Sequence, residues 1–148
     1  MARRRPRYHW LLLGLSAGLG CGTPVAEVQG TLKLNGAPLS DVEVYFVPDG
    51  EKGTRGPRAA AVTDPEGHFH LDLGALGRGA LVGHHRVVLV DRLALNPVPD
   101  DRVDRPGARP RGPQPSRIPA KYNAATTTPL CVEVRVEPQA VDLDITDP

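Results

Sequence analysis

Histidine is the residue type in this chain best suited to binding a metal ion. Beyond residue 20 there are four: His68, His70, His84 and His85. His68 and His70 are two positions apart, so in a strand their side chains share one face, about 7 Å apart. With His84 from another strand they could form a zinc site, because imidazole nitrogens are common zinc ligands. No Asp or Glu at ligand spacing completes that set, so we predict no metal and no cofactor and keep these three histidines only as weak candidates.

Two carboxylates beside a glycine form a second feature that could do chemistry. They lie in the stretch Thr63-Asp64-Pro65-Glu66-Gly67. Calcium prefers oxygen ligands, but the spacing of a calcium-binding EF-hand loop is absent. The same residues suit a tight turn, in which Asp accepts backbone hydrogen bonds, Pro fixes its own φ and Gly tolerates positive φ. We therefore assign Thr63, Asp64 and Gly67 to a structural turn.

The two cysteines, Cys21 and Cys131, have different surroundings. Cys21 directly follows an apolar run, whereas Cys131 begins an alternating stretch that ends at Val136. If Cys21 is acylated, Cys131 has no partner within the chain and is expected to be a small buried hydrophobe. If Cys21 is free, a disulfide between the two can form in an oxidising compartment. A catalytic role for Cys131 is least favoured, because no triad-like residues accompany it.

The N-terminus has the features of an export signal. Arg3, Arg4, Arg5 and Arg7 precede ten apolar or small residues at 10–19. This length suits the core of a signal peptide and is too short to span a bilayer. We predict a signal peptide at 1–20 and a lipid-anchor tether at 21–24. A buried helix of the domain is the alternative, and the absence of an amphipathic pattern argues against it.

Residues 15–22, Leu-Ser-Ala-Gly-Leu-Gly-Cys-Gly, resemble the end of a bacterial lipoprotein signal. The resemblance implies that diacylglycerol is attached to Cys21, and several acyl chains hold a protein stably on a membrane. The expected place is the cell membrane or outer membrane, facing the periplasm or the exterior. Gly18 stands where a lipoprotein signal usually carries Leu. Because Gly18 and Gly20 also suit an ordinary signal peptidase, plain secretion remains an alternative.

The composition limits what the rest of the chain can be. Its 148 residues suffice for one domain. Removing the four N-terminal arginines leaves 14 basic against 17 acidic residues, a net charge of −3 for residues 21–148. The basic character therefore belongs to the N-terminus, and we predict no nucleic-acid partner. Gly and Pro together make 32 of 148 residues, which favours a turn-rich β fold.

Strands must position the residues described above, and the strongest pattern is at 59–73. After the turn at 63–67, Phe69, Leu71 and Leu73 alternate with polar residues. This pattern predicts a β-hairpin with one buried face. Its tip is a candidate interaction surface through Asp64.

Other strands follow from the same alternation. Asn35-Gly36 predicts a type I′ turn after a strand at 25–34, and a second strand follows at 41–47. A run of four apolar residues within 83–90 predicts a central strand. The last two strands are expected at 130–136 and 140–145, with a turn at 137–139 between them. Val132, Val134 and Val136 are expected to face the core.

The segment between the predicted strands at 83–90 and 130–136 is rich in proline and arginine. We predict that residues 91–117 are a mostly disordered loop, because little in them can be buried. Order is expected to return at Ile118. Tyr122 is expected to fix the loop to the sandwich and to form, with Asp64, the surface for a partner.

Several motifs together resemble the carboxypeptidase regulatory-like domain. They are Gly30-Thr-Leu, Asn35-Gly-Ala-Pro-Leu and the stretch Thr63-Asp-x-x-Gly-x-Phe-x-Leu71. The resemblance covers residues 25–90 best. It implies a single antiparallel Greek-key β-sandwich of about seven strands, transthyretin-like (prealbumin-like), in residues 25–148. Phe69 and Leu71 would be its inward residues.

The same resemblance bears on function, because this domain is known as a non-catalytic module. With the N-terminus and the stretch Ile118-Pro-Ala-Lys-Tyr-Asn-Ala-Ala-Thr-Thr-Thr-Pro-Leu130, the chain is similar to small lipoproteins of planctomycete-type bacteria. The transthyretin-like group also contains a hydrolase, but its C-terminal Tyr-Arg-Gly-Ser motif is absent here. Gly-x-Ser-x-Gly and His-Glu-x-x-His are absent too.

We therefore predict that the chain is not an enzyme. The expected role is structural or interactive at the bacterial cell envelope, with the membrane and an unknown envelope protein or polysaccharide as partners. A carbohydrate- or metal-binding module on the same fold is the alternative, and a transthyretin-like hydrolase is a weaker one.

Overall fold

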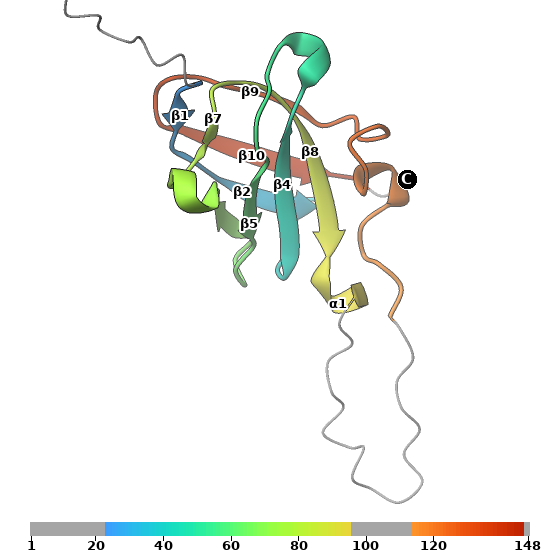
Figure 1. The fold of residues 1–148 in the computed structure, drawn as a ribbon. Helices are drawn as coiled ribbons and strands as arrows, with labels where there is room; N and C mark the ends of the chain where they lie inside the picture. Colours follow the sequence, from blue (N-terminus) through green and yellow to red (C-terminus); the bar gives the residue numbers. More distant parts are fainter. Residues whose placement is uncertain (1–22, 96–113, 147–148) are drawn as a thin grey trace, which may run out of the picture.

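The fold is all-β, as the turn-rich composition predicts. The computed structural model describes residues 23–95 and 114–146, so the predicted signal peptide and Cys21 lie outside the described residues. Figure 1 shows strands in two layers; the described residues add one short α-helix, α1 (Arg92–Leu95), and single turns of 3-10 helix. Within the described ranges, no helix has the length and apolar character needed to cross a membrane.

One layer is built around β2 (Val28–Leu34). On one side β2 pairs with β10 (Gln139–Ile145), and on the other with β3 (Ala37–Pro38) and β6 (His68–His70). The pairings with β3 and β6 are antiparallel, whereas β10 runs parallel to β2 along all seven residues. The prediction of a purely antiparallel fold is therefore wrong at this strand pair.

The other layer has the order β5-β4-β8-β9, with every neighbour antiparallel. β8 (Gly83–Asp91) lies inside this sheet, which confirms the central strand predicted from its apolar run. The remaining strands of this sheet are β4 (Val42–Pro48), β5 (Ala59–Val62) and β9 (Cys131–Val134). A small third sheet pairs β1 (Val25–Ala26) with β7 (Ala80–Leu81).

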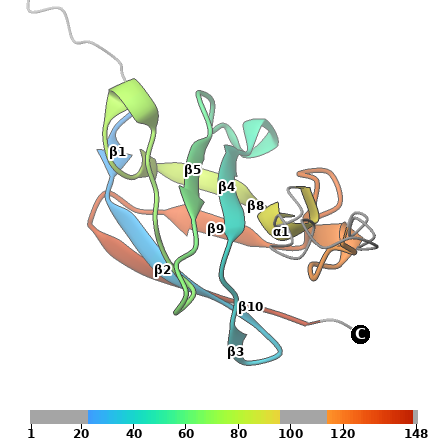
Figure 2. The same cartoon turned by 90° about the horizontal axis from the view of Figure 1, so that it is seen from below.

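The core fills the space between the two four-stranded layers, which cross one another in Figure 2. Phe46 from β4 and Phe69 from β6 meet there, with ring centroids 6.4 Å apart. The alternation at 69–73 is confirmed, because Phe69, Leu71 and Leu73 are all buried. Aromatic rings from opposite sheets thus join the two layers at the centre of the core.

Two glycines of this fold have geometries that depend on the absence of a side chain. Asn35 and Gly36 have φ values of 51° and 81°, as a type I′ turn requires. Gly30 is in close contact with its neighbours, because a Cβ there would lie 2.0 Å from the carbonyl oxygen of Val141. Glycine at this position lets β10 and Phe69 approach β2 closely.

The predicted hairpin at 59–73 is wrong, because its two arms belong to different sheets. β5 pairs with β4, whereas β6 pairs with β2. The turn between them crosses from one layer to the other. The arms are linked by an isolated bridge between Ala60 and Asp72 and, at the turn, by a hydrogen bond from the Asp64 N–H to the His68 carbonyl.

The end of the chain differs from prediction in the same way. β9 and β10 lie in different sheets, so residues 135–138 cross between layers and do not form a hairpin turn. Val134 is buried, but β9 ends there and Val136 is 69% exposed. Val136 was expected to face the core, and the departure of the chain from the sheet after Val134 carries it outside.

Candidate functional site

The turn at 63–67 is held by both sheets. The Thr63 hydroxyl oxygen accepts a hydrogen bond from the Val42 N–H at 3.0 Å, and the Thr63 N–H donates to the Val42 carbonyl. At the other end, the Leu32 N–H donates to the Gly67 carbonyl at 2.8 Å. Thr63 therefore belongs to the edge of one layer and Gly67 to the other.

Gly67 is the position in this turn where no other residue fits. Its φ is +81°, and a Cβ would lie 2.6 Å from the carbonyl oxygen of Leu32. Both the positive φ and this approach exclude a side chain. The glycine that the sequence identified as a turn residue is thus required by contact with β2 as well as by the turn.

Asp64 organises the tip of the turn. One carboxylate oxygen accepts hydrogen bonds from the N–H groups of Glu66 at 3.0 Å and His68 at 2.7 Å. The second lies 3.5 Å from Nδ1 of His68, and both side chains are about half exposed. This is the backbone-capping geometry expected of Asp in a turn.

The three weak zinc candidates are not brought together. His68 and His70 lie on the exposed face of β6, whereas His84 lies on β8 in the other sheet. Across the described ranges, the one group of three metal-ligating side chains whose ligand atoms all lie within 4.8 Å of one another is Asp64, Glu66 and His68. All three are exposed, and Asp64 is already engaged by the backbone of the turn. The hydrogen bonding of the turn therefore accounts for this group.

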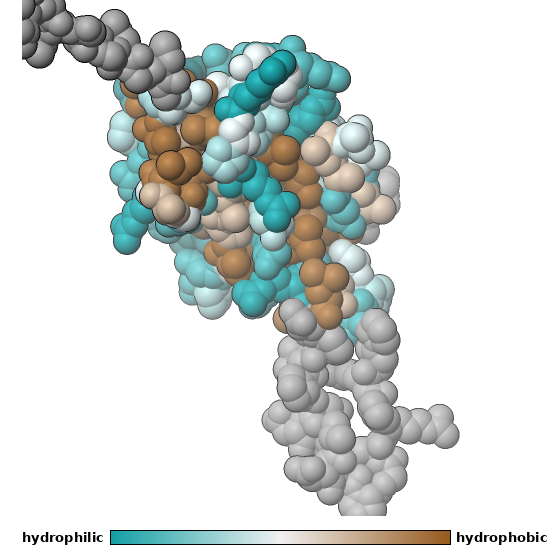
Figure 3. Space-filling model, in the orientation of Figure 1, coloured by the Kyte–Doolittle hydropathy of each residue, from teal (hydrophilic) through white to brown (hydrophobic). Residues whose placement is uncertain are grey.

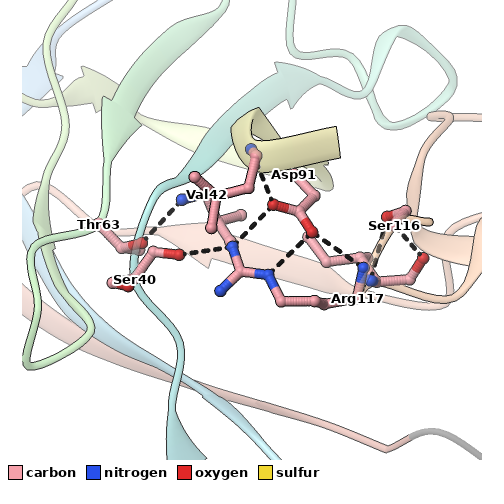
Figure 4. A network of polar contacts seen from close by, with 8 residues as sticks. Ser40, Val42, Thr63, Asp91, Ser116 and Arg117 are labelled. Carbon is pink, nitrogen blue, oxygen red and sulfur yellow. Dashed lines mark hydrogen bonds and ion pairs between the residues drawn. The ribbon is translucent and has the colours of Figure 1, made fainter. Parts of the chain in front are cut away.

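A second polar cluster, which the sequence did not reveal, lies at the end of β8 (Figure 4). Asp91, 1% exposed in its side chain, accepts hydrogen bonds from Arg117 on both carboxylate oxygens, at 2.7 Å and 2.9 Å. Arg117 also donates to the carbonyl of Ser40 at 2.9 Å, and its own N–H donates to Asp91. The Leu93 N–H completes the set at 3.1 Å.

This cluster fixes the ionisation of Asp91. Burial alone raises the pKa of the Asp91 carboxyl, but the hydrogen bonds and positive charge of Arg117 outweigh burial and hold that pKa below its ordinary value of 3.8. Asp91 raises the pKa of Arg117 in return. The ion pair joins the two ends of the segment between Asp91 and Arg117. Residues 96–113 of that segment lie outside the described residues.

The described ends of the predicted 91–117 loop are therefore structured. Asp91 closes β8, α1 follows it, and Arg117 is bonded to the sheet. Tyr122 is in the short helix η3 (Ala120–Tyr122) and is 5% exposed, within the core. It fixes the returning chain as predicted, but a buried ring is not available to a partner, so Tyr122 is withdrawn from the interaction surface.

His85 is a further buried polar residue that sequence reasoning passed over. Its Nε2 lies 2.7 Å from the carbonyl oxygen of Leu81, while Nδ1 has no hydrogen-bond partner among the described residues. Its ring lies beside Phe46, with centroids 5.9 Å apart. Burial lowers the pKa of His85 below its ordinary 6.5, although the bond to Leu81 acts in the opposite direction. The alternation of β8 was the available signal, because it places positions 85, 87 and 89 on the inner face.

Cys131 is exposed and has no disulfide partner among the described residues, so the expectation of a small buried hydrophobe is wrong. It is the first residue of β9 and shares the outer face with Glu133. The described chain begins at Thr23, two residues after Cys21, and enters the fold through β1.

Comparison of the chain with protein-family models, with curated proteins and with solved structures finds no match.

Proposed function

We propose that this chain is an exported lipoprotein whose β-sandwich has a structural or interaction role at the bacterial cell envelope, without catalysis. The observation that carries the proposal is the N-terminal sequence. Four arginines precede ten apolar or small residues, and Cys21 follows within two residues of that run. This is the order of a signal peptide with an acylated cysteine at its end. The predicted partners are the membrane, through the acyl chains, and an envelope protein or polysaccharide.

The proposal extends to the type of sandwich, a transthyretin-like Greek-key fold of the carboxypeptidase regulatory-like class. Its support is the motif at 63–71. Gly67 adopts positive φ against β2, and Phe69 and Leu71 are 1% and 2% exposed. The motif therefore has a clear structural purpose, which is to carry the chain across the core while filling it.

The buried polar side chains support a scaffold without chemistry of its own. Apart from His85, the described ones bond to backbone groups of neighbouring loops and strands: Asp49, Thr54, Thr63, Asp91 and Thr128. Thr54, for example, accepts a hydrogen bond from the His84 N–H, and Thr128 donates to the Val87 carbonyl. Such bonds satisfy backbone groups that would otherwise be buried without partners.

The test is the intact mass of the mature protein recovered from its own host, together with its distribution between membrane and soluble fractions. We expect a chain that begins at Cys21, carries the mass of acyl chains and partitions with membranes. The Cys21→Ser variant is the control and should lack acyl chains. A wild-type chain that starts at another residue, or that is soluble and without lipid, would refute the anchor.

A further inference from the structure

The large exposed hydrophobic residues of the sandwich are unevenly distributed. Among the residues that the structure describes there are five, and three of them lie at the end where the chain enters the fold: Val25, 38% exposed, Leu76, 58%, and Val136, 69%. The other two, Val62 and Leu95, lie near the opposite end, where the backbone of Asp41 bonds both to Thr63 and to Arg92. Single exposed hydrophobics are ordinary, but three around one point of the surface form a feature.

Strand pairing and hydrogen bonds place the segments that carry these three residues at the same end of the fold. Val25 is in β1, which pairs with β7, and Leu76 is in the short helix η2 (Gly74–Leu76) that leads into β7. Val136 precedes Gln139, whose N–H donates to the Glu27 carbonyl at the start of β2. Both ribbon views place η2 and the β9–β10 connection beside β1 (Figures 1 and 2). Figure 3 shows apolar surface gathered over β1, β7 and η2, next to the start of the described chain.

The acylation proposed for Cys21 places a lipid at this end. Four Cα-to-Cα steps separate Cys21 from Val25. A fully extended chain covers at most about 3.6 Å per step, so β1 lies within about 14 Å of Cys21. An acyl chain on Cys21 is inserted in the bilayer, which brings this end of the sandwich to the headgroups.

We infer that this end of the sandwich docks on the lipid bilayer, with Val25, Leu76 and Val136 inserted among the headgroups. The inference rests on the proposed acylation of Cys21. The anchor supplies a high local concentration, so contacts too weak to bind a free protein are sufficient. At this end Arg78 shares one hollow with the acidic residues Glu27 and Asp72, so its charge is offset. The contact is therefore apolar in character, and a zwitterionic membrane is enough for it.

The orientation of the molecule follows from this contact. The turn at 63–67 and the Asp91–Arg117 cluster lie at the opposite end. There the Asp41 N–H donates to the Thr63 carbonyl, and Arg117 donates to the Ser40 carbonyl. That end faces away from the membrane. It is the surface that an envelope partner would meet.

The test uses the acylated full mature protein in phosphatidylcholine vesicles. A nitroxide label is attached at Leu76→Cys or, as the matched control, at Leu95→Cys, each in a Cys131→Ser background so that one thiol reacts. Collision rates with oxygen, which concentrates in lipid, and with a water-soluble nickel chelate report the position of each label. We expect the label at 76 to gain oxygen collisions several-fold and lose nickel collisions relative to the same label in the unacylated Cys21→Ser chain, and the label at 95 to change little.

Two further variants make the test specific. Val25→Ser combined with Val136→Ser should return the label at 76 towards water, whereas Val62→Ser should leave it in the lipid. All these positions are exposed, so circular dichroism should show an unchanged fold. If mass spectrometry finds the acyl chains but the label at 76 is as accessible to nickel as the label at 95, docking is refuted while the anchor stands. If no acyl chain is found, both proposals fail.

Discussion

Removing the Arg117 side chain should destabilise the fold more than removing any of its exposed arginines. Arg117→Ala abolishes two charge-assisted hydrogen bonds to the buried Asp91 and one to the Ser40 carbonyl. Hydrogen bonds to charged groups contribute about 1.5–3 kcal/mol each, and breaking a buried ion pair costs about 3–5 kcal/mol. The cost here is smaller, because Arg117 is 33% exposed and Asp91 keeps its bonds to the N–H groups of residues 93 and 117.

We therefore expect a loss of about 2–3 kcal/mol in the free energy of unfolding, or roughly 10 °C in Tm at about 4 °C per kcal/mol. The measurement is urea unfolding at pH 7, followed by circular dichroism, on the mature chain with Cys21→Ser. The control is Arg92→Ala, whose pair with Glu43 is 3.8 Å long and about one-third to one-half exposed. Such pairs contribute about 0–1 kcal/mol.

The pH dependence of this loss gives an independent check. Because the pKa of folded Asp91 lies below its ordinary 3.8, its contribution to stability is present above pH 3.8 and is lost as the pH falls through the lower, folded value. The difference between wild type and Arg117→Ala should therefore shrink in acid. A loss below about 0.5 kcal/mol at pH 7, or a difference that persists undiminished at the acid limit, would refute the role assigned to this pair.

Three further predictions concern other parts of the sandwich. Gly67→Ala should cost about 1–2 kcal/mol more than Gly53→Ala in urea unfolding, because both residues have φ near +80° but only at Gly67 would the Cβ meet backbone; equal losses would show that the contact with β2 yields easily. Below pH 6.5 the free energy of unfolding of the wild type should fall by up to about 1.4 kcal/mol per pH unit, because buried His85, whose pKa is lowered, stays neutral in the folded chain while the unfolded chain takes up a proton. His85→Leu should reduce the slope of stability against pH in this range, measured by a pH series of unfolding curves, and an unchanged slope would contradict the assignment. Replacing residues 96–113 with a short Gly-Ser linker should leave Tm the same or slightly higher. Asp91 and Arg117 join the ends of the segment directly, and each halving of a loop's length lowers the entropic cost of closing it by only about 0.6 kcal/mol. A large fall in Tm would show that the segment contributes to the core.

The sequence predicted which face of each strand is buried much better than which strands pair with one another. Alternation with a period of two is a local property, so it correctly placed Phe69, Leu71 and Leu73 inside. Strand pairing depends on where the chain goes after a turn. At 63–67 the turn residues are those of a hairpin, yet Thr63 is hydrogen-bonded to Val42 of β4 and Gly67 to Leu32 of β2. No local pattern distinguishes these two outcomes.

The polar cluster was missed for a related reason. Asp91 and Arg117 are 26 positions apart, and each was read as part of a proline- and arginine-rich loop. Their pairing appears only when the chain returns to the sheet. The position of Cys131 was predictable, because the alternation that buries Val134 places Cys131 and Glu133 outside. Extending that alternation to Val136 failed, since the strand had already ended.

The parallel pairing of β10 with β2 has a consequence for the order of folding. Residues that meet in this pair, such as Thr31 and Asp142, are 111 positions apart in the sequence. Contacts between such distant residues form slowly, because a long loop must close before they contribute any free energy. One layer of the sandwich therefore stays incomplete until almost the entire chain has been synthesised. Such a delay favours passage through a membrane in the unfolded state, which the proposed signal peptide requires.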